Sequence, residues 1–307
     1  MRLAGISLSR WLATGRRFGA ILALVCLATV VSAKPVAAKA AGTIAWKHQT
    51  LSQWHGFVCH HFVVAGKACW VVEPHHSLPG HPWVWCMKFA DAFPHRCSEI
   101  SLVHRGFCLA VMQFGSMLGS PKSMKLADAF YQTVTRAGLS QKVVLLGISR
   151  GGLYAYNWAA LHPDRVSVIY GDAPVCDFKS WPGGFGKGRG SPADWRNLLK
   201  QYGFKNKAAA MAWKGNPIDE LAPIAKANIP LISVVGLADH TVPPAENTFI
   251  LAERYKKLGG EIVILCKPNM HHHPHGLSHP GVVVDFIVRH ALAQSADLCQ
   301  KIQQPTK

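Results

Sequence analysis

The clearest chemical signal in this sequence is the pentapeptide GISRG at residues 147–151. A predicted strand at 142–146, which is apolar after Lys142, precedes it, and a stretch rich in alanine and aromatic residues at 152–160 follows it. In such a strand–turn–helix setting, a G-x-S-x-G motif makes a turn too tight for side chains at its glycine positions. The turn presents the serine hydroxyl at the start of the helix. The motif therefore predicts that Ser149 is a nucleophile.

A carboxylate that could serve this serine follows the apolar run 229–235. A serine hydroxyl needs a base beside it, and the base needs an acid that orients it. Asp239 lies just beyond that run, in a loop before the next helical stretch, and we predict that it is the acid. Asp172 and Asp177, which follow the earlier run 166–170, are alternative acids.

The predicted base lies in a loop crowded with histidines. Residues 271–275 read HHHPH and follow the apolar run 261–265, which completes the chain order serine, acid, histidine. We predict His272 as the base, with His273 and His275 as alternatives. Neutral imidazoles are common metal ligands, so a metal site is an alternative. Because adjacent histidines do not converge easily on one ion and no H-E-x-x-H motif is present, we predict that the loop holds no metal.

The remaining site predictions concern the oxyanion and the substrate. The backbone N–H of Arg150, directly after the nucleophile, is expected to be one oxyanion donor. Trp83 is our candidate for the second. We expect the Arg150 side chain to pair with a carboxylate such as Asp172, and we predict that Trp181 and Asp172 contact substrate. Tryptophans that could stack on sugar rings are Trp83, Trp85, Trp181, Trp195 and Trp213.

Alternating apolar runs and helical patterns position these residues. Strands are expected at 54–64, 68–72, 106–112, 142–146, 166–170, 229–235 and 261–265. Helices are expected at 120–136, 150–161, 192–202, 206–213, 245–258 and 282–293, with a helix start in 83–93. This alternation predicts a mostly parallel central sheet with helices on both faces. Residues 175–225 are expected to form a cap insertion.

Length, charge and the N-terminal residues predict the location of the protein and its domain boundaries. The chain has 307 residues, of which 49% are hydrophobic, and a net charge of +17. Residues 1–33 carry arginines, no acidic residue and an apolar run, so they predict a signal peptide and a secreted or periplasmic protein with no stable membrane span after cleavage. A flexible leader is expected at 34–45, the main domain at 46–299 and a tail at 300–307. The basic residues are scattered, which argues against nucleic acid.

Nine cysteines are present, of which one lies in the predicted signal peptide. An even number remains in a chain that we expect to be exported, so we predict two to four disulfides. Cys108 and Cys266, on apolar runs, are the residues expected to be buried thiols instead. The other candidates are Cys59, Cys69, Cys86, Cys97, Cys176 and Cys299.

The GISRG motif, the acid segment 236–243 and the histidine loop together resemble the α/β-hydrolase superfamily over about residues 55–295. The resemblance is to esterases of the prolyl-oligopeptidase and dienelactone-hydrolase type, and residues 170–184 resemble exported bacterial hydrolases of that group. The Ser149-Arg150 pair is similar to that of glucuronoyl esterases. The resemblance implies ester or amide hydrolysis without a cofactor, and it allows the acid to come from the earlier strand.

These observations predict an exported serine hydrolase that cleaves carboxylic esters, including esters on small molecules or glycans, through an acyl-enzyme. A serine peptidase of the prolyl-oligopeptidase type is one alternative. A catalytically silent glycan-binding protein with the same fold is another, since a fold alone does not determine function.

Overall fold

The computed structural model describes residues 44–303, with side chains described for residues 44–293. The predicted signal peptide at 1–33 and most of the predicted leader lie outside the described residues. None of the helices in the described range is long and apolar enough to cross a membrane.

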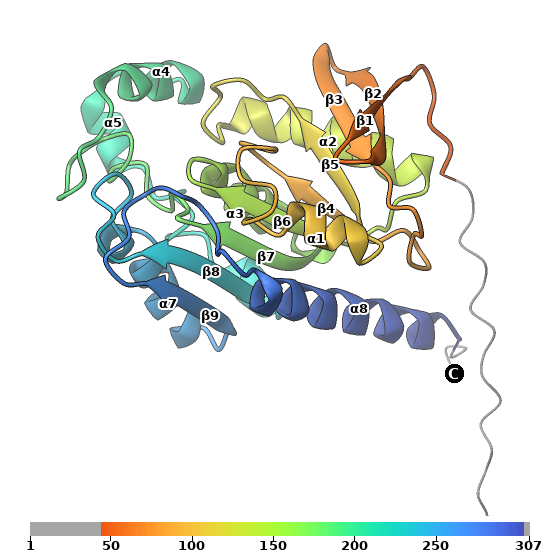
Figure 1. Ribbon diagram of the computed structural model, residues 1–307. Coiled ribbons are helices and arrows are strands. Elements are labelled where there is room, and N and C mark those ends of the chain that lie inside the picture. The colour runs from red at the N-terminus through yellow and green to blue at the C-terminus, as the bar shows by residue number, and fades with distance from the viewer. Residues whose placement is uncertain (1–43, 304–307) are drawn as a thin grey trace, which may run out of the picture. The chain divides into compact units, whose positions relative to one another are not determined.

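Among the residues described, nine strands form one sheet in the order β1-β2-β3-β5-β4-β6-β7-β8-β9 (Figure 1). Strands β1, β2, β3 and β5 pair antiparallel, and every pairing from β5 to β9 is parallel. The strands are β1 (Thr50–Trp54), β2 (Phe57–Val64), β3 (Lys67–Val72), β4 (Trp83–Cys86), β5 (Cys108–Met112), β6 (Val143–Ile148), β7 (Val166–Asp172), β8 (Leu231–Gly236) and β9 (Ile262–Lys267).

Helices cover both faces of this sheet. One apolar cluster packs α2, α3, α6 and α7 against one face, and a second packs α1 and α8 against the other. The helices are α1 (Glu99–His104), α2 (Pro121–Ala137), α3 (Gly151–Leu161), α4 (Pro192–Tyr202), α5 (Lys207–Ala212), α6 (Ala222–Lys226), α7 (Thr248–Lys257) and α8 (Gly281–Gln303). The mostly parallel sheet with helices on both faces is confirmed.

The central strands are apolar throughout because both of their faces are covered. Every residue of β6, β7 and β8 is buried, which explains why these runs lack the alternation of a half-exposed strand. Parallel strands that end together bring their following loops to one edge of the sheet. The loops after β6, β8 and β9 carry Ser149, Asp239 and His272.

Two predictions of local structure were wrong. Residues 83–93 do not start a helix, because Trp83–Cys86 forms strand β4 between β5 and β6, with all four side chains buried. Burial on both sides outweighs the local pattern here. The single strand predicted at 54–64 is divided by a turn at His55 and Gly56, whose φ angles of 47° and 88° lie in the left-handed region. Helices α1 and α6 and strand β1 had no expected counterpart.

The disulfide prediction is contradicted for the part of the chain with described side chains. Seven cysteines carry free thiols there: Cys59, Cys69, Cys86, Cys97, Cys108, Cys176 and Cys266. Cys59 and Cys69 lie on paired strands three residues out of register, so they point to opposite faces of the sheet. Cys86 and Cys108 are offset in the same way. Cys108 is a buried thiol as expected, whereas Cys266 is exposed.

The segment between β7 and β8 contains α4, α5 and α6, and α4 and α5 stand at the upper left of Figure 1. A third apolar cluster joins this segment to the turn around Ser149. Phe178, Trp181 and Leu198 of the segment pack with Leu153 of α3 and with Val242, which follows β8. The segment therefore packs on the loops that carry the predicted site residues, and its role as a cap stays a prediction.

A buried carboxyl group gives the fold a pH-dependent stability. Glu99 at the start of α1 is fully buried, and burial raises its pKa from 4.5 to about 7. The folded state therefore holds this proton between pH 4.5 and 7 while the unfolded state releases it, so stability falls as the pH rises through this window. The loss is about 3 kcal/mol above pH 7.

We expect Glu99→Gln to raise the melting temperature by several degrees at pH 8 and to change it little at pH 4.5, because the amide carries no charge to bury. Thermal denaturation followed by circular dichroism at the two pH values measures this difference. An equal shift at both values would contradict the argument from burial.

Candidate active site

The turn that carries Ser149 is held in a conformation that few non-glycine residues adopt. Ser149 follows β6 and has a φ of 51°, in the left-handed region. A Cβ at Gly147 would come within 3.1 Å of backbone atoms of Gly151 and Gly152, and one at Gly152 would lie 2.7 Å from the carbonyl oxygen of Val175. The turn therefore needs glycine at these positions.

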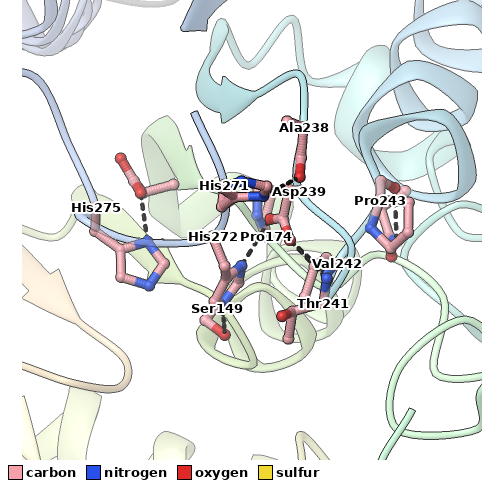
Figure 2. A network of polar contacts seen from close by, with 12 residues as sticks. Ser149, Pro174, Ala238, Asp239, Thr241, Val242, Pro243, His271, His272 and His275 are labelled. Carbon is pink, nitrogen blue, oxygen red and sulfur yellow. Dashed lines mark hydrogen bonds and ion pairs between the residues drawn. The ribbon is translucent and has the colours of Figure 1, made fainter. Parts of the chain in front are cut away.

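A chain of hydrogen bonds joins the three residues predicted as nucleophile, base and acid. Ser149 Oγ lies 3.0 Å from Nε2 of His272, and Nδ1 of His272 lies 2.7 Å from Oδ2 of Asp239 (Figure 2). If Nδ1 carries the proton, it donates to the carboxylate, and Nε2 has a lone pair that faces the hydroxyl. The arrangement is able to move a proton from the serine to the imidazole.

Asp239 is held as a carboxylate by its surroundings. Its other oxygen, Oδ1, accepts hydrogen bonds from the backbone N–H groups of Thr241 and Val242, at 2.8 and 2.9 Å. Burial raises the pKa of Asp239, but the hydrogen bond and charge of His272 and the two backbone donors outweigh it, so that its pKa is lowered. The group is ionised at neutral pH and is available to stabilise a positive imidazolium.

The alternative acid and base form a separate pair. Asp172, at the end of β7, is fully buried and accepts a hydrogen bond from Nδ1 of His275 at 2.7 Å. It also accepts from the N–H of Gly276 and the hydroxyl of Tyr170. The prediction that Asp172 contacts substrate is therefore wrong, because protein donors surround its carboxylate. Asp177 instead accepts from the N–H of Lys179 at 2.8 Å.

The other two histidines of the loop differ in their surroundings. His271 is exposed, and its Nδ1 lies 2.6 Å from the carbonyl oxygen of Ala238. The ring of His273 lies 4.9 Å from that of His272 and 4.8 Å from that of His275. Loss of hydration beside its neighbours, followed by the charges of His272 and His275, lowers the pKa of the exposed His273. It is therefore neutral at pH 7.

The structure changes the assignment of the oxyanion donors. The backbone N–H of Arg150 stands at the start of α3, as expected. Trp83 lies at the opposite end of the sheet, because it pairs with Val143 at the start of β6, whereas Ser149 follows the end of that strand. The segment after β4 lies near Ser149 instead, since a Cβ at Gly151 would lie 3.6 Å from the backbone nitrogen of Lys88. The backbone of Lys88 therefore replaces Trp83 as candidate for the second donor.

The Arg150 side chain connects the serine turn to the inserted segment. Its Nη1 lies 3.3 Å from Oδ1 of Asp194 in α4, so its partner is not the predicted Asp172. The guanidinium also lies over the rings of Phe89 and Trp181, at 5.3 and 5.0 Å. Trp181 is only 7% exposed, so its predicted role in binding substrate requires that Arg150 or the segment move.

Most of the tryptophans proposed to stack on sugars are not available beside Ser149. Trp83 and Trp85 are fully buried in the core. Trp213 is 36% exposed but lines a separate cavity of about 330 Å³ with residues of α2 and α3, including Met124 and Asn157. These residues therefore offer no sugar platform beside Ser149.

A cleft of about 340 Å³ lies directly beside the predicted base. It is lined by Arg189, His240, Thr241, His271, His272 and His273. No acidic side chain lines this cleft within the range that the structure describes. Sequence reasoning missed Arg189, because it lies in a Gly-rich part of the insertion with no motif around it. The cleft favours a ligand with negative charge.

Comparisons with known proteins agree with this architecture. A family model described as the alpha/beta hydrolase fold matches residues 75–212. A puromycin-hydrolyzing peptidase from Mycobacterium tuberculosis superposes with a TM-score of 0.56 at 15% identity, covering 72% of this chain and 36% of that one. This chain thus spans about a third of that peptidase.

A smaller enzyme matches along most of its length. An S-formylglutathione hydrolase from Agrobacterium tumefaciens superposes with a TM-score of 0.54 at 14% identity, covering 79% of this chain and 97% of that one. Dipeptidyl peptidase 4 from Porphyromonas gingivalis gives a TM-score of 0.52 at 13% identity over 80% of this chain and 35% of its own. A search of curated proteins found no match. At these identities the likeness extends to the fold.

Proposed function

This chain has the α/β-hydrolase fold, and we propose that it is a serine hydrolase that cleaves carboxylic esters through an acyl-enzyme. The observation that carries the proposal is the hydrogen-bonded series of Ser149, His272 and Asp239, at 3.0 and 2.7 Å. Each of the three lies in a loop after a different parallel strand, so distant parts of the sequence converge on one geometry. Such convergence is the usual basis for recognising a nucleophile with its base and acid.

In the proposed reaction, Ser149 Oγ attacks the ester carbonyl and passes its proton to Nε2 of His272. Asp239 keeps the imidazole in the required tautomer and stabilises its positive charge. The tetrahedral oxyanion accepts hydrogen bonds from the backbone N–H of Arg150 and from the segment at Lys88. His272 then protonates the leaving alcohol, and a water molecule activated by the same imidazole releases the acyl group from Ser149.

An ester substrate is supported better than a peptide. The match to the S-formylglutathione hydrolase covers 97% of that enzyme, whereas the matches to the two peptidases cover 36% and 35% of theirs. The peptidase alternative is supported by the fact that two of the structural neighbours are peptidases. A catalytically silent glycan binder has less support, because its tryptophans are largely buried and the polar contacts of Ser149 would have no role.

The cationic cleft beside His272 supports a substrate with negative charge near the ester. Arg189 and three histidines other than His272 line it, and a carboxylate on the acyl or alcohol group would find donors there. Acidic carbohydrates carry such groups, which keeps a glycan ester among the candidate substrates. Export is proposed from residues 1–33 of the sequence alone.

A panel of aryl esters and anilides with matched acyl groups tests this proposal. We expect hydrolysis of the esters, with kcat/KM about tenfold higher when the acyl group carries a carboxylate, which corresponds to about 1.4 kcal/mol. The Ser149→Ala protein serves as the control for background hydrolysis. Anilides cleaved as fast as esters would favour the peptidase, and no turnover of either class would leave the silent binder.

A further inference from the structure

The imidazoles of three histidines beside Ser149 converge on one point, although the sequence predicted that adjacent histidines would not. One ligand atom from each of His272, His273 and His275 lies within 4.8 Å of the other two. The three rings stand almost perpendicular to one another, with centroids 4.8 to 4.9 Å apart. The expectation that histidines of one short loop do not converge on a point is therefore not met here.

Two of these imidazoles have carboxylate partners on the side away from the group. Nδ1 of His272 faces Asp239, and Nδ1 of His275 faces Asp172, both at 2.7 Å. Each partner favours the tautomer with the proton on Nδ1, so that Nε2 carries the lone pair; in His272 this lone pair faces the Ser149 hydroxyl, with which a metal ion would compete. A histidine that binds a metal is usually held in this way by a carboxylate or carbonyl behind it.

We infer that His272, His273 and His275 form a site for a divalent transition-metal ion such as Zn²⁺, and that an ion bound there blocks Ser149. Imidazole nitrogen suits Zn²⁺ and Cu²⁺ and is a poor ligand for Mg²⁺ or Ca²⁺. Two nitrogens on a tetrahedral zinc ion lie about 3.3 Å apart, given Zn–N distances near 2.0–2.1 Å. His273 is exposed, so its side chain is free to make the required movement.

The charges in direct contact with the three rings are negative. The carboxylates of Asp172 and Asp239 lie directly behind two of the rings and carry two negative charges. The ammonium group of Lys267 and the guanidinium of Arg96 balance them, but both cations are held by backbone carbonyl oxygens of the loop. The carboxylates are thus the charges in direct contact with the rings, whereas the two cations contact the backbone.

An ion at this site would act on the proposed reaction through the base. Nε2 of His272 is the atom that accepts the Ser149 proton, at 3.0 Å, and a lone pair that binds a metal no longer accepts that proton. The inhibitory effect rests on the proposed function, whereas binding of the ion does not.

Calorimetric titration of Zn²⁺ into the metal-free full-length protein tests the site directly. We expect one ion per chain and binding weakened at least about tenfold by His273→Ala, which removes an exposed ligand. His271→Ala is the matched control, because His271 lies in the same loop but outside the group and should bind Zn²⁺ as the unaltered protein does. Absence of one-to-one binding, or equal affinity in both variants, would overturn the site.

The effect on turnover is measured separately on the aryl ester. We expect Zn²⁺ to inhibit hydrolysis at the concentrations at which it binds, EDTA to reverse the inhibition, and His273→Ala to require at least about tenfold more Zn²⁺. Binding without any ester hydrolysis would leave the metal site standing and refute the proposed function. Hydrolysis that is unaffected by Zn²⁺ at saturation would refute the proposed block alone.

Discussion

Replacing Ser149 with alanine is expected to lower the turnover of p-nitrophenyl acetate by about six orders of magnitude. The change removes the only atom that forms the acyl bond in the proposed reaction, so the remaining rate comes from background hydrolysis and from the preformed oxyanion donors. The loss should appear in kcat, because the side chain contributes little to binding the ester.

The protein should keep its fold after this change. The strained turn is set by glycines and by two backbone hydrogen bonds, in which the N–H of Ser149 donates to the carbonyl oxygen of Asp172 and the N–H of Val175 donates to that of Ser149. Neither involves the hydroxyl. Circular dichroism and melting temperature check this, and Ser52→Ala, at an exposed position of β1, is the control for handling and purification. A Ser149→Ala protein with normal turnover would exclude Ser149 as the nucleophile.

Replacing Asp239 with asparagine is expected to lower kcat by about 10⁴-fold. An amide cannot stabilise the imidazolium, and its NH₂ group favours the tautomer of His272 in which Nδ1 accepts, so that Nε2 keeps a proton and cannot act as base. Because the backbone donors of Thr241 and Val242 face Oδ1 of Asp239, the side chain should remain in place. Steady-state kinetics on the aryl ester measures the loss.

Asp172→Asn makes the same chemical change at the competing carboxylate and is the matched comparison. Its partner is His275, whereas the imidazole that faces Ser149 is that of His272. We expect kcat to fall by about tenfold or less and the melting temperature to fall, because a buried network with three donors is disturbed. A larger loss of kcat in Asp172→Asn than in Asp239→Asn would mean that Asp172, at the end of β7, is the acid that orients the base.

Local sequence signals were sufficient for the serine turn. The glycines around Ser149 and the apolar run before it specify a strand, a tight turn and a helix without help from the rest of the chain. The choice of Asp239 needed the chain order serine, acid, histidine as well, but this order could not distinguish the several imidazoles of the histidine loop. Which imidazole is the base depends on which ring faces Asp239 and which faces Asp172. Tertiary packing decides this.

Features that depend on distant contacts were not predictable. Trp83 was misplaced because β4 is too short to show a strand pattern, and only its position between β5 and β6 defines it. The disulfide prediction counted cysteines but could not see that those on paired strands point to opposite faces. The partner of Arg150 is Asp194, in a segment of the chain whose packing on the serine turn has no sequence signature.

The most direct test of this account is covalent labelling with a fluorophosphonate, followed by intact-mass and peptide mass spectrometry. We expect one adduct per chain, located on the peptide that contains Ser149, with no adduct in Ser149→Ala and very slow labelling in Asp239→Asn. A protein that stays unlabelled under conditions in which a known serine esterase reacts fully, or that is labelled at another residue, would contradict it.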